Sequence, residues 1–267
     1  MRDVLSVAEG VGVEVVDDVR PAVTLWSGAQ AFRTRWRYDR ASLEWSVPGL
    51  IGTGDDDTTG DALRFDATTR VLREAVLARP TKVLFDDRVW NAALDVPVRE
   101  GALHLVEPAV LTLPSMDVAM FDLDLAGFVA LRDDAATADL AGWCAVRAAQ
   151  EVALLFDAAG RWAGWRVEDP VRRARPMGWP DVREEPVAEG PDRQSLAALL
   201  YDWMCIDASP RVRPDEASDP DDVAHLVALR TRARALAAYA ADPVVAGVAT
   251  DVAAHVHWSW GFFRVGE

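Results

Sequence analysis

The chain has 267 residues, of which 51% are hydrophobic and 27% charged, a balance typical of globular proteins that excludes a disordered chain. Its 43 acidic and 28 basic side chains give a formal net charge of −15. Such a charge repels nucleic acid phosphates and anionic membranes and attracts cations. We therefore expect no nucleic acid and no membrane as partners, and the charge favours a basic protein partner.

The chain shows no export or membrane signal. Its first residues contain too short an apolar stretch for a signal peptide, and no run approaches the length of about 18 apolar residues that a membrane helix needs. The two cysteines, Cys144 and Cys205, both stand in apolar surroundings far apart in the sequence, which favours free thiols in a reducing compartment. We predict a cytoplasmic protein.

The first part of the chain is predicted to form β structure. Strands are expected at 23–26, 32–38 and 43–47, and in the middle one apolar residues alternate with arginines, as in a half-buried strand. The segment 48–60 is predicted as a loop rich in glycine and aspartate. Apolar residues at helical spacing predict a helix over 68–79, which a proline ends.

Short apolar runs continue through 82–130, separated by prolines and a glycine, and predict successive strands. A hydroxyl at Thr137, followed by a carboxylate, predicts the start of a helix that reaches residue 150. Two further apolar runs, 152–156 and 161–167, flank a turn that ends in glycine and predict a hairpin.

The last third has a different character. Prolines and mixed charge mark 169–192 as a linker or long loop. Helices are predicted over 195–206 and 219–241, the second with an apolar face suited to packing. A strand is predicted over 255–264.

Because the strands are clustered rather than alternating with helices, we predict the α+β class, with a mainly antiparallel sheet in the first two thirds and helices mostly C-terminal. An α/β fold is the alternative. We expect residues 1–267 to form a single domain with a proline-rich loop near 169–192. The alternative is a β-rich domain, 1–168, followed by a helical domain, 193–267.

Asp122 and Asp124 are the candidates for catalytic residues. The segment 120–127 resembles the first motif of haloacid dehalogenase-type phosphatases, which implies that one carboxylate attacks phosphorus while the other transfers a proton beside magnesium. The Gly-Thr pair that follows the second aspartate in that family is absent here. We favour the simpler interpretation that both aspartates lie on the polar face of a strand.

His255 and His257 are the candidates for metal ligands. On the predicted terminal strand, residues two apart point the same way, so the two imidazoles could bind a divalent metal together with a third ligand. The same alternation arises when a strand has one polar face, which is the interpretation we favour.

Asp55, Asp56 and Asp57 are the candidates for partner binding. They lie in the acidic loop, whose oxygen-bearing residues partly match the spacing of a calcium-binding EF-hand loop. The residues at the ninth and twelfth positions depart from that pattern. We favour an acidic surface loop, with calcium binding as the alternative.

For function, we predict a non-catalytic protein that binds a basic protein, as an immunity protein or inhibitor does. Two alternatives stay open. One is a metal-dependent small-molecule enzyme that uses the histidine or aspartate pair, and the other is a ligand-binding module whose pocket draws on the 11 tryptophans. We predict no cofactor, and a divalent metal belongs to the enzyme alternative.

Overall fold

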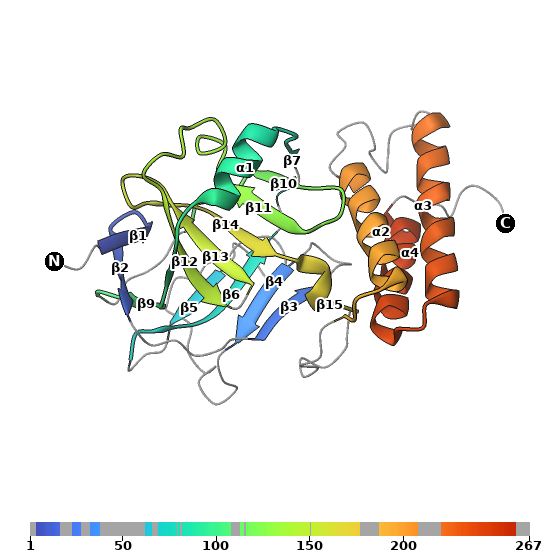
Figure 1. Cartoon of the computed structure of the whole chain (residues 1–267), viewed down its shortest axis with the longest axis horizontal. Helices are drawn as coiled ribbons and strands as arrows, with labels where there is room; N and C mark the ends of the chain where they lie inside the picture. The colour runs from blue at the N-terminus through green and yellow to red at the C-terminus, as the bar shows by residue number, and fades with distance from the viewer. Residues whose placement is uncertain are drawn as a thin grey trace.

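The computed structural model describes residues 4–16, 23–27, 33–37, 62–65, 69–78, 80, 82–107, 113–114, 116–149, 151–176, 187–207 and 220–259. Its strands lie in the first two thirds of the chain and its longer helices in the last third. Figure 1 shows the strands gathered on the side of the N-terminus and the longer helices of the last third standing together on the opposite side. The predicted α+β class is therefore confirmed.

The described strands form three sheets, with the orders β1-β2-β9, β7-β10-β11-β14-β13-β12-β8 and β15-β3-β4-β6-β5. Most neighbours run antiparallel, and the parallel pairs are β7 with β10, β8 with β12 and β15 with β3. The strands are β1 (Val4–Ala8), β2 (Val11–Val16), β3 (Val23–Ser27), β4 (Arg33–Arg37), β5 (Ala62–Phe65), β6 (Leu72–Ala78), β7 (Lys82–Val83), β8 (Val98–Glu100), β9 (Ala102–Leu105), β10 (Val118–Phe121), β11 (Gly127–Leu131), β12 (Cys144–Ala149), β13 (Val152–Phe156), β14 (Trp162–Glu168) and β15 (Ala174–Arg175).

The inner strands of the seven-stranded sheet, such as β11, β13 and β14, are buried on both faces. In β13, Leu154 and Phe156 belong to the larger core cluster, while the intervening Ala153 and Leu155 belong to a second cluster. A strand covered on both sides has no polar face, which explains why this segment is apolar without interruption. Gly164 fits the same tight packing, because a Cβ there would lie 2.2 Å from the carbonyl oxygen of Ala130.

Helix α1 (Asp87–Asp95) lies against the second cluster. Its buried residues are Val89 and Ala93. Asp86 caps its N-terminus by accepting hydrogen bonds from the backbone N–H groups of Arg88 and Val89. The sequence prediction of strands throughout 82–130 missed this helix.

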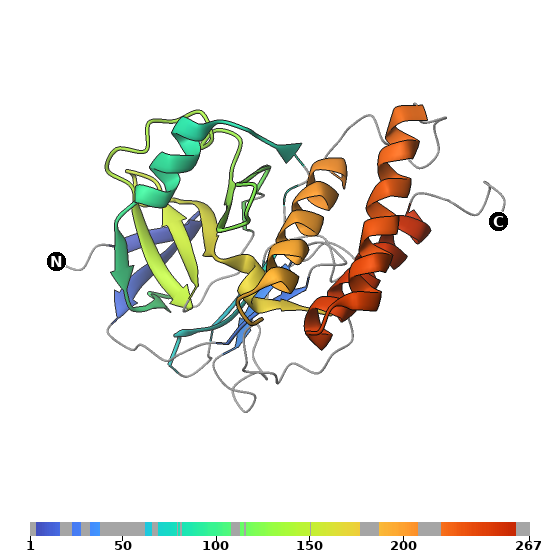
Figure 2. The same cartoon turned by 45° about the vertical axis from the view of Figure 1, so that its right-hand side comes forward.

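The C-terminal helices α2 (Pro191–Asp207), α3 (Pro220–Tyr239) and α4 (Pro243–Ser259) pack together. Figure 2 shows α2 next to the sheets and α3 on the outer side. A 3₁₀-helix, η2 (Pro170–Arg173), and β15 connect the end of β14 toward this bundle. The predicted helices over 195–206 and 219–241 are confirmed with slightly different ends.

Other sequence predictions are confirmed for the β part. The hairpin of β13 and β14 forms as expected, with its turn from Asp157 to Gly160. Strands predicted at 23–26 and 32–38 correspond to β3 and β4. The predicted strand at 43–47 and the loop at 48–60 lie outside the described residues. Strands β1 and β2 were not predicted.

Three element predictions are wrong. The segment expected as a helix over 68–79 contains β6, because pairing with β4 and β5 outweighs its local helical spacing. The helix expected over 137–150 is replaced by turns and then β12, which pairs with β13 and β8. The terminal strand is also wrong for residues 255–259, which belong to α4.

Within the predicted linker at 169–192, the described residues form η2, β15 and the first residues of α2. The rest of that segment, 177–186, lies outside the described residues. The prolines at 170 and 191 stand at helix starts, where a missing N–H leaves no hydrogen bond unmade.

Candidate interaction surface

The ends of β7 and β10 place two exposed apolar side chains at the same end of the seven-stranded sheet. These strands run parallel, with Ala119 opposite Val83, so the chain leaves both at the same end. Phe85 follows β7 and is 66% exposed, and Leu123 follows β10 and is 69% exposed. We call Phe85, Asp86, Asp87, Leu123 and Asp124 the strand-end surface.

An aromatic cluster lies beneath Phe85. The Phe85 ring meets the ring of Phe121 edge to face at 6.2 Å between centroids. Phe121 in turn stacks on Phe128 at 6.0 Å and meets Tyr201 of α2 edge to face at 5.5 Å. The exposed ring therefore packs on Phe121, which is itself held by the core and by α2.

The turn between β10 and β11 fixes the position of Leu123. The carboxylate of Asp122 accepts the backbone N–H of Ala126 at 2.8 Å, and its carbonyl accepts the N–H of Leu125 at 3.2 Å. Leu125 has a φ of 47°, in the left-handed region, and its side chain is buried. Burial of Leu125 fixes the turn while Leu123, two residues earlier, remains exposed.

Carboxylates surround the two apolar side chains. Asp87 and Asp124 are exposed, and neither forms an ion pair with a described residue. The guanidinium of Arg88 lies 3.9 Å from the carboxylate of Asp86, which also caps α1. The strand-end surface is thus both apolar and acidic.

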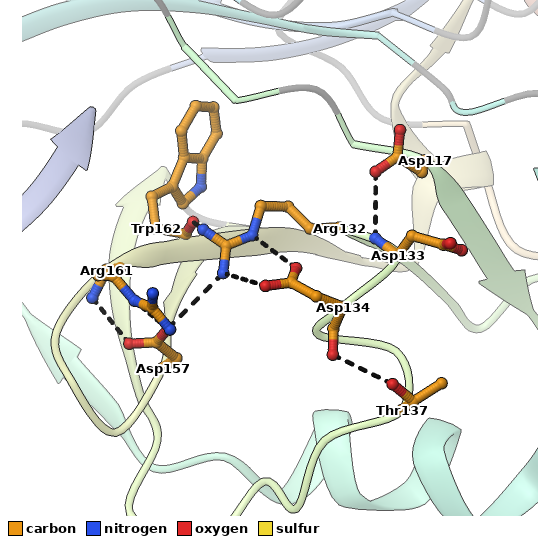
Figure 3. Close-up of polar contacts among 8 residues, drawn as sticks. All are labelled: Asp117, Arg132, Asp133, Asp134, Thr137, Asp157, Arg161 and Trp162. Carbon is orange, nitrogen blue, oxygen red and sulfur yellow. Dashed lines mark hydrogen bonds and ion pairs between the residues drawn. The ribbon is translucent and has the colours of Figure 1, made fainter. Parts of the chain in front are cut away.

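A different arrangement of charges surrounds Arg132, just after β11 (Figure 3). Its guanidinium donates to the carbonyl of Trp162 at 2.8 Å and to the carboxylate of Asp134 at 3.0 Å. It also lies 3.6 Å from the carboxylate of Asp157, which accepts a hydrogen bond from Arg161 at 2.8 Å. We call Arg132, Asp134, Asp157 and Arg161 the charged cluster.

The charged cluster holds two turns together. Asp157 also accepts the backbone N–H groups of Ala159 and Arg161, which shapes the β13–β14 turn. Figure 3 shows the neighbouring turn held by hydrogen bonds from the N–H of Asp133 to Asp117 and from Thr137 to the carbonyl of Asp134. Each of these carboxylates is used within the fold, so the geometry is that of a structural network.

Arg166 of β14 is buried, and its side chain caps the C-terminal end of α1. Its guanidinium donates to the carbonyls of Ala93 at 2.8 Å and of Leu94, which lie in the last turn of the helix. Burial lowers the pKa of Arg166, and the charge of nearby Glu168 partly opposes that effect.

Glu168 also accepts a hydrogen bond from Arg147 at 3.2 Å. Burial acts to lower the pKa of Arg147, but Glu168 and then Glu100 outweigh it, so that pKa is raised.

Tyr201 and Cys205 lie one helical turn apart on α2. Burial raises the pKa of Tyr201, and the neighbouring Cys205 adds to that rise. Burial likewise raises the pKa of the Cys205 thiol, against the opposing hydrogen bond with Tyr201. Both groups are therefore neutral near pH 7, and Cys205 lacks the thiolate character of a nucleophile.

The structure places the predicted site residues differently from the sequence analysis. Asp122 and Asp124 do not lie on a strand, because β10 ends at Phe121 and both belong to the turn that follows. His255 and His257 lie in α4, so the strand alternation that paired them does not apply. Asp55, Asp56 and Asp57 lie outside the described residues.

Within the part of the chain that the structure describes, no group of three or more His, Cys, Asp or Glu side chains is arranged to hold a metal ion. Searching the same residues, we find no helix with the length and apolar character needed to cross a membrane. Neither Cys144 nor Cys205 forms a disulfide bond.

Sequence reasoning did not identify Phe85 as a surface residue. Its exposure depends on the parallel pairing of β7 with β10, which joins residues 36 positions apart and leaves no local pattern. The order of phenylalanine followed by aspartate does not mark exposure either, because it recurs at Phe65 and Phe156, which are buried.

Comparison of the chain with protein-family models and with curated proteins finds no match.

Proposed function

We propose that this chain is a non-catalytic cytoplasmic protein that binds a basic protein, as an immunity protein or an inhibitor does. The observation that supports this function best is the direction of its charges. Four guanidinium groups of the described residues face inward, and most of the carboxylates that they pair with are more exposed. Arg88, Arg161 and Arg232 are instead at least half exposed.

The inward-facing arginines are Arg132, Arg147, Arg166 and Arg193, whose side chains are only 6% to 22% exposed. Each faces a carboxylate of the same chain. Their positive charge is largely cancelled before it reaches solvent.

The exposed carboxylates therefore dominate the outward field of a chain whose formal charge is −15. Such a field accelerates encounter with a cationic protein and slows encounter with an anionic one. Because Cys144 and Cys205 form no disulfide bond, a reducing, cytoplasmic setting suits that encounter.

The test is affinity capture with the tagged full chain in cells that make it, followed by identification of captured proteins and measurement of association kinetics with the purified partner. We expect a basic protein whose association rate falls about tenfold or more between low and physiological salt. Failure to capture any basic protein would contradict the proposal.

Native mass spectrometry with elemental analysis of the same preparation addresses the enzyme alternative. We expect the mass of the bare chain or of its complex with the protein partner. Stoichiometric transition metal, or a small molecule that turns over during incubation, would replace this function with the enzyme alternative.

A further inference from the structure

We propose that the strand-end surface is the docking site for the basic partner. A segment of the partner places an apolar side chain against Phe85 and Leu123, and its lysine or arginine side chains face Asp87 and Asp124. This inference rests on the proposed function and adds the place of contact and the chemistry of the partner segment.

The exposed apolar area is the first argument. Among the large apolar side chains that the described residues leave exposed, Phe85 and Leu123 follow neighbouring strands of one sheet. The others are Val4 in β1 and, on α3, Val227 and Tyr239. Two exposed apolar side chains at one sheet end can both contact a single partner segment, whereas a single exposed side chain is ordinary.

The Phe85 side chain and the backbone that carries Leu123 are already held in position. Phe85 packs against Phe121, and the turn that carries Leu123 is closed by Asp122 and by the buried Leu125. A partner that binds held side chains loses less conformational freedom than one that must order a mobile loop. The surface is therefore suited to act as an anchor.

Charge complementarity selects the occupant. Asp87 and Asp124 have no cation partner among the described residues, so an incoming lysine or arginine meets them without displacing an existing ion pair. An acidic peptide or an anionic lipid surface meets repulsion there. A second copy of this chain, itself carrying −15, meets repulsion as well. A basic protein segment with an apolar side chain at its centre fits all of these constraints.

Site-specific crosslinking in the cells that make the protein tests the place of contact. A photo-crosslinking amino acid replaces Leu123 in the full-length chain, and in a matched control it replaces Tyr239, which is 87% exposed on α3. We expect the chain labelled at position 123 to crosslink to a basic protein and the control to do so at least tenfold less. No crosslink, or a crosslink to a second copy of the chain, overturns the proposal.

Variants test the contribution of each kind of side chain with the purified partner. We expect the double variant Phe85→Ser, Leu123→Ser to raise Kd at least tenfold, as for loss of central apolar anchors. The control Tyr239→Ser should leave Kd within twofold. The double variant Asp87→Asn, Asp124→Asn should slow association about threefold at low salt and change dissociation little.

The failures of the two proposals are distinguishable. If the wild-type chain captures a basic protein and the double variant Phe85→Ser, Leu123→Ser captures it equally well, the function stands and this docking site is wrong. If the wild-type chain captures no basic protein, the function itself is wrong. Thermal unfolding of each variant checks that loss of binding does not come from loss of the fold.

Discussion

Two turns of the seven-stranded sheet share a backbone hydrogen-bond pattern but differ in the side chains around it. The β10–β11 turn begins at Asp122 and the β13–β14 turn at Asp157, and each aspartate accepts the N–H of the residue four positions later. In each, the third residue after the aspartate has a left-handed φ, 47° at Leu125 and 75° at Gly160. The two turns therefore share a geometry and differ in their side chains.

The side chains of one turn stabilise the fold, whereas the other turn leaves an apolar side chain exposed. Asp157 forms ion pairs with two guanidinium groups and is only 11% exposed, so ion pairs stabilise its turn. The turn at Asp122 instead carries an exposed leucine, and a second leucine takes the position where glycine is easiest. Burial in the core explains the leucine at position 125, whereas stability does not explain the exposed leucine at position 123, which the proposed docking site does.

We expect the largest loss of stability in the β13–β14 turn. Asp157→Ala removes two backbone hydrogen bonds and leaves Arg132 and Arg161 without this carboxylate, so we expect the free energy of unfolding to fall by about 3 kcal/mol. Chemical denaturation measures it. Asp157→Asn keeps an acceptor for the backbone and should lose less than half as much. A loss below about 1 kcal/mol in the alanine variant would show that the cluster is not structural.

The matching substitution in the β10–β11 turn should cause a smaller loss of stability. Asp122→Ala removes one backbone hydrogen bond and no ion pair among the described residues, so we expect a loss of about 1 kcal/mol by the same measurement. An equal loss in Asp122→Ala and Asp157→Ala would remove the distinction between the turns.

The left-handed φ of Gly160 in the β13–β14 turn can also be tested by substitution. Gly160→Ala forces a side chain into a φ of 75°, where its Cβ has room, 3.5 Å from the nearest atom of Leu5. Strain rather than overlap then sets the effect, and we expect about 1 kcal/mol of destabilisation. A stability equal to wild type would mean that the backbone relaxes without penalty and that Leu125 is not strained by its φ either.

The smallest expected effect on stability is at Leu123. Because the side chain is 69% exposed, Leu123→Ser should change the free energy of unfolding by less than about 0.5 kcal/mol. The same denaturation series measures it. A loss above about 1 kcal/mol would assign Leu123 a packing role instead of a docking role.

The two turns also show what the sequence could predict. The β13–β14 turn was predicted because glycine at position 160 supplies the left-handed residue and apolar runs flank it. The β10–β11 turn was not, because alternating leucine and aspartate continue the period-2 pattern of a strand through residue 125. Only burial of Leu125 in the three-dimensional core makes its unusual φ tolerable, and local sequence does not contain that information.

The remaining errors have the same origin. The carboxylate of Asp139, interpreted as part of a helix start, accepts the N–H of Ala141 in a turn. A capping signal and a turn signal use the same residues, so only pairing with distant strands decides between them. The α+β class was predictable because it depends on clusters of elements rather than on any single one.

Stability and partner binding, measured on the same two variants Asp157→Ala and Leu123→Ser, test whether one turn serves the fold and the other serves docking. We expect a crossed result. Asp157→Ala loses stability and, at a temperature where it is folded, binds the purified basic partner with unchanged Kd, whereas Leu123→Ser keeps its stability and binds more weakly. A Leu123→Ser variant that binds like wild type, or a loss of binding in Asp157→Ala as large as in Leu123→Ser, would contradict it.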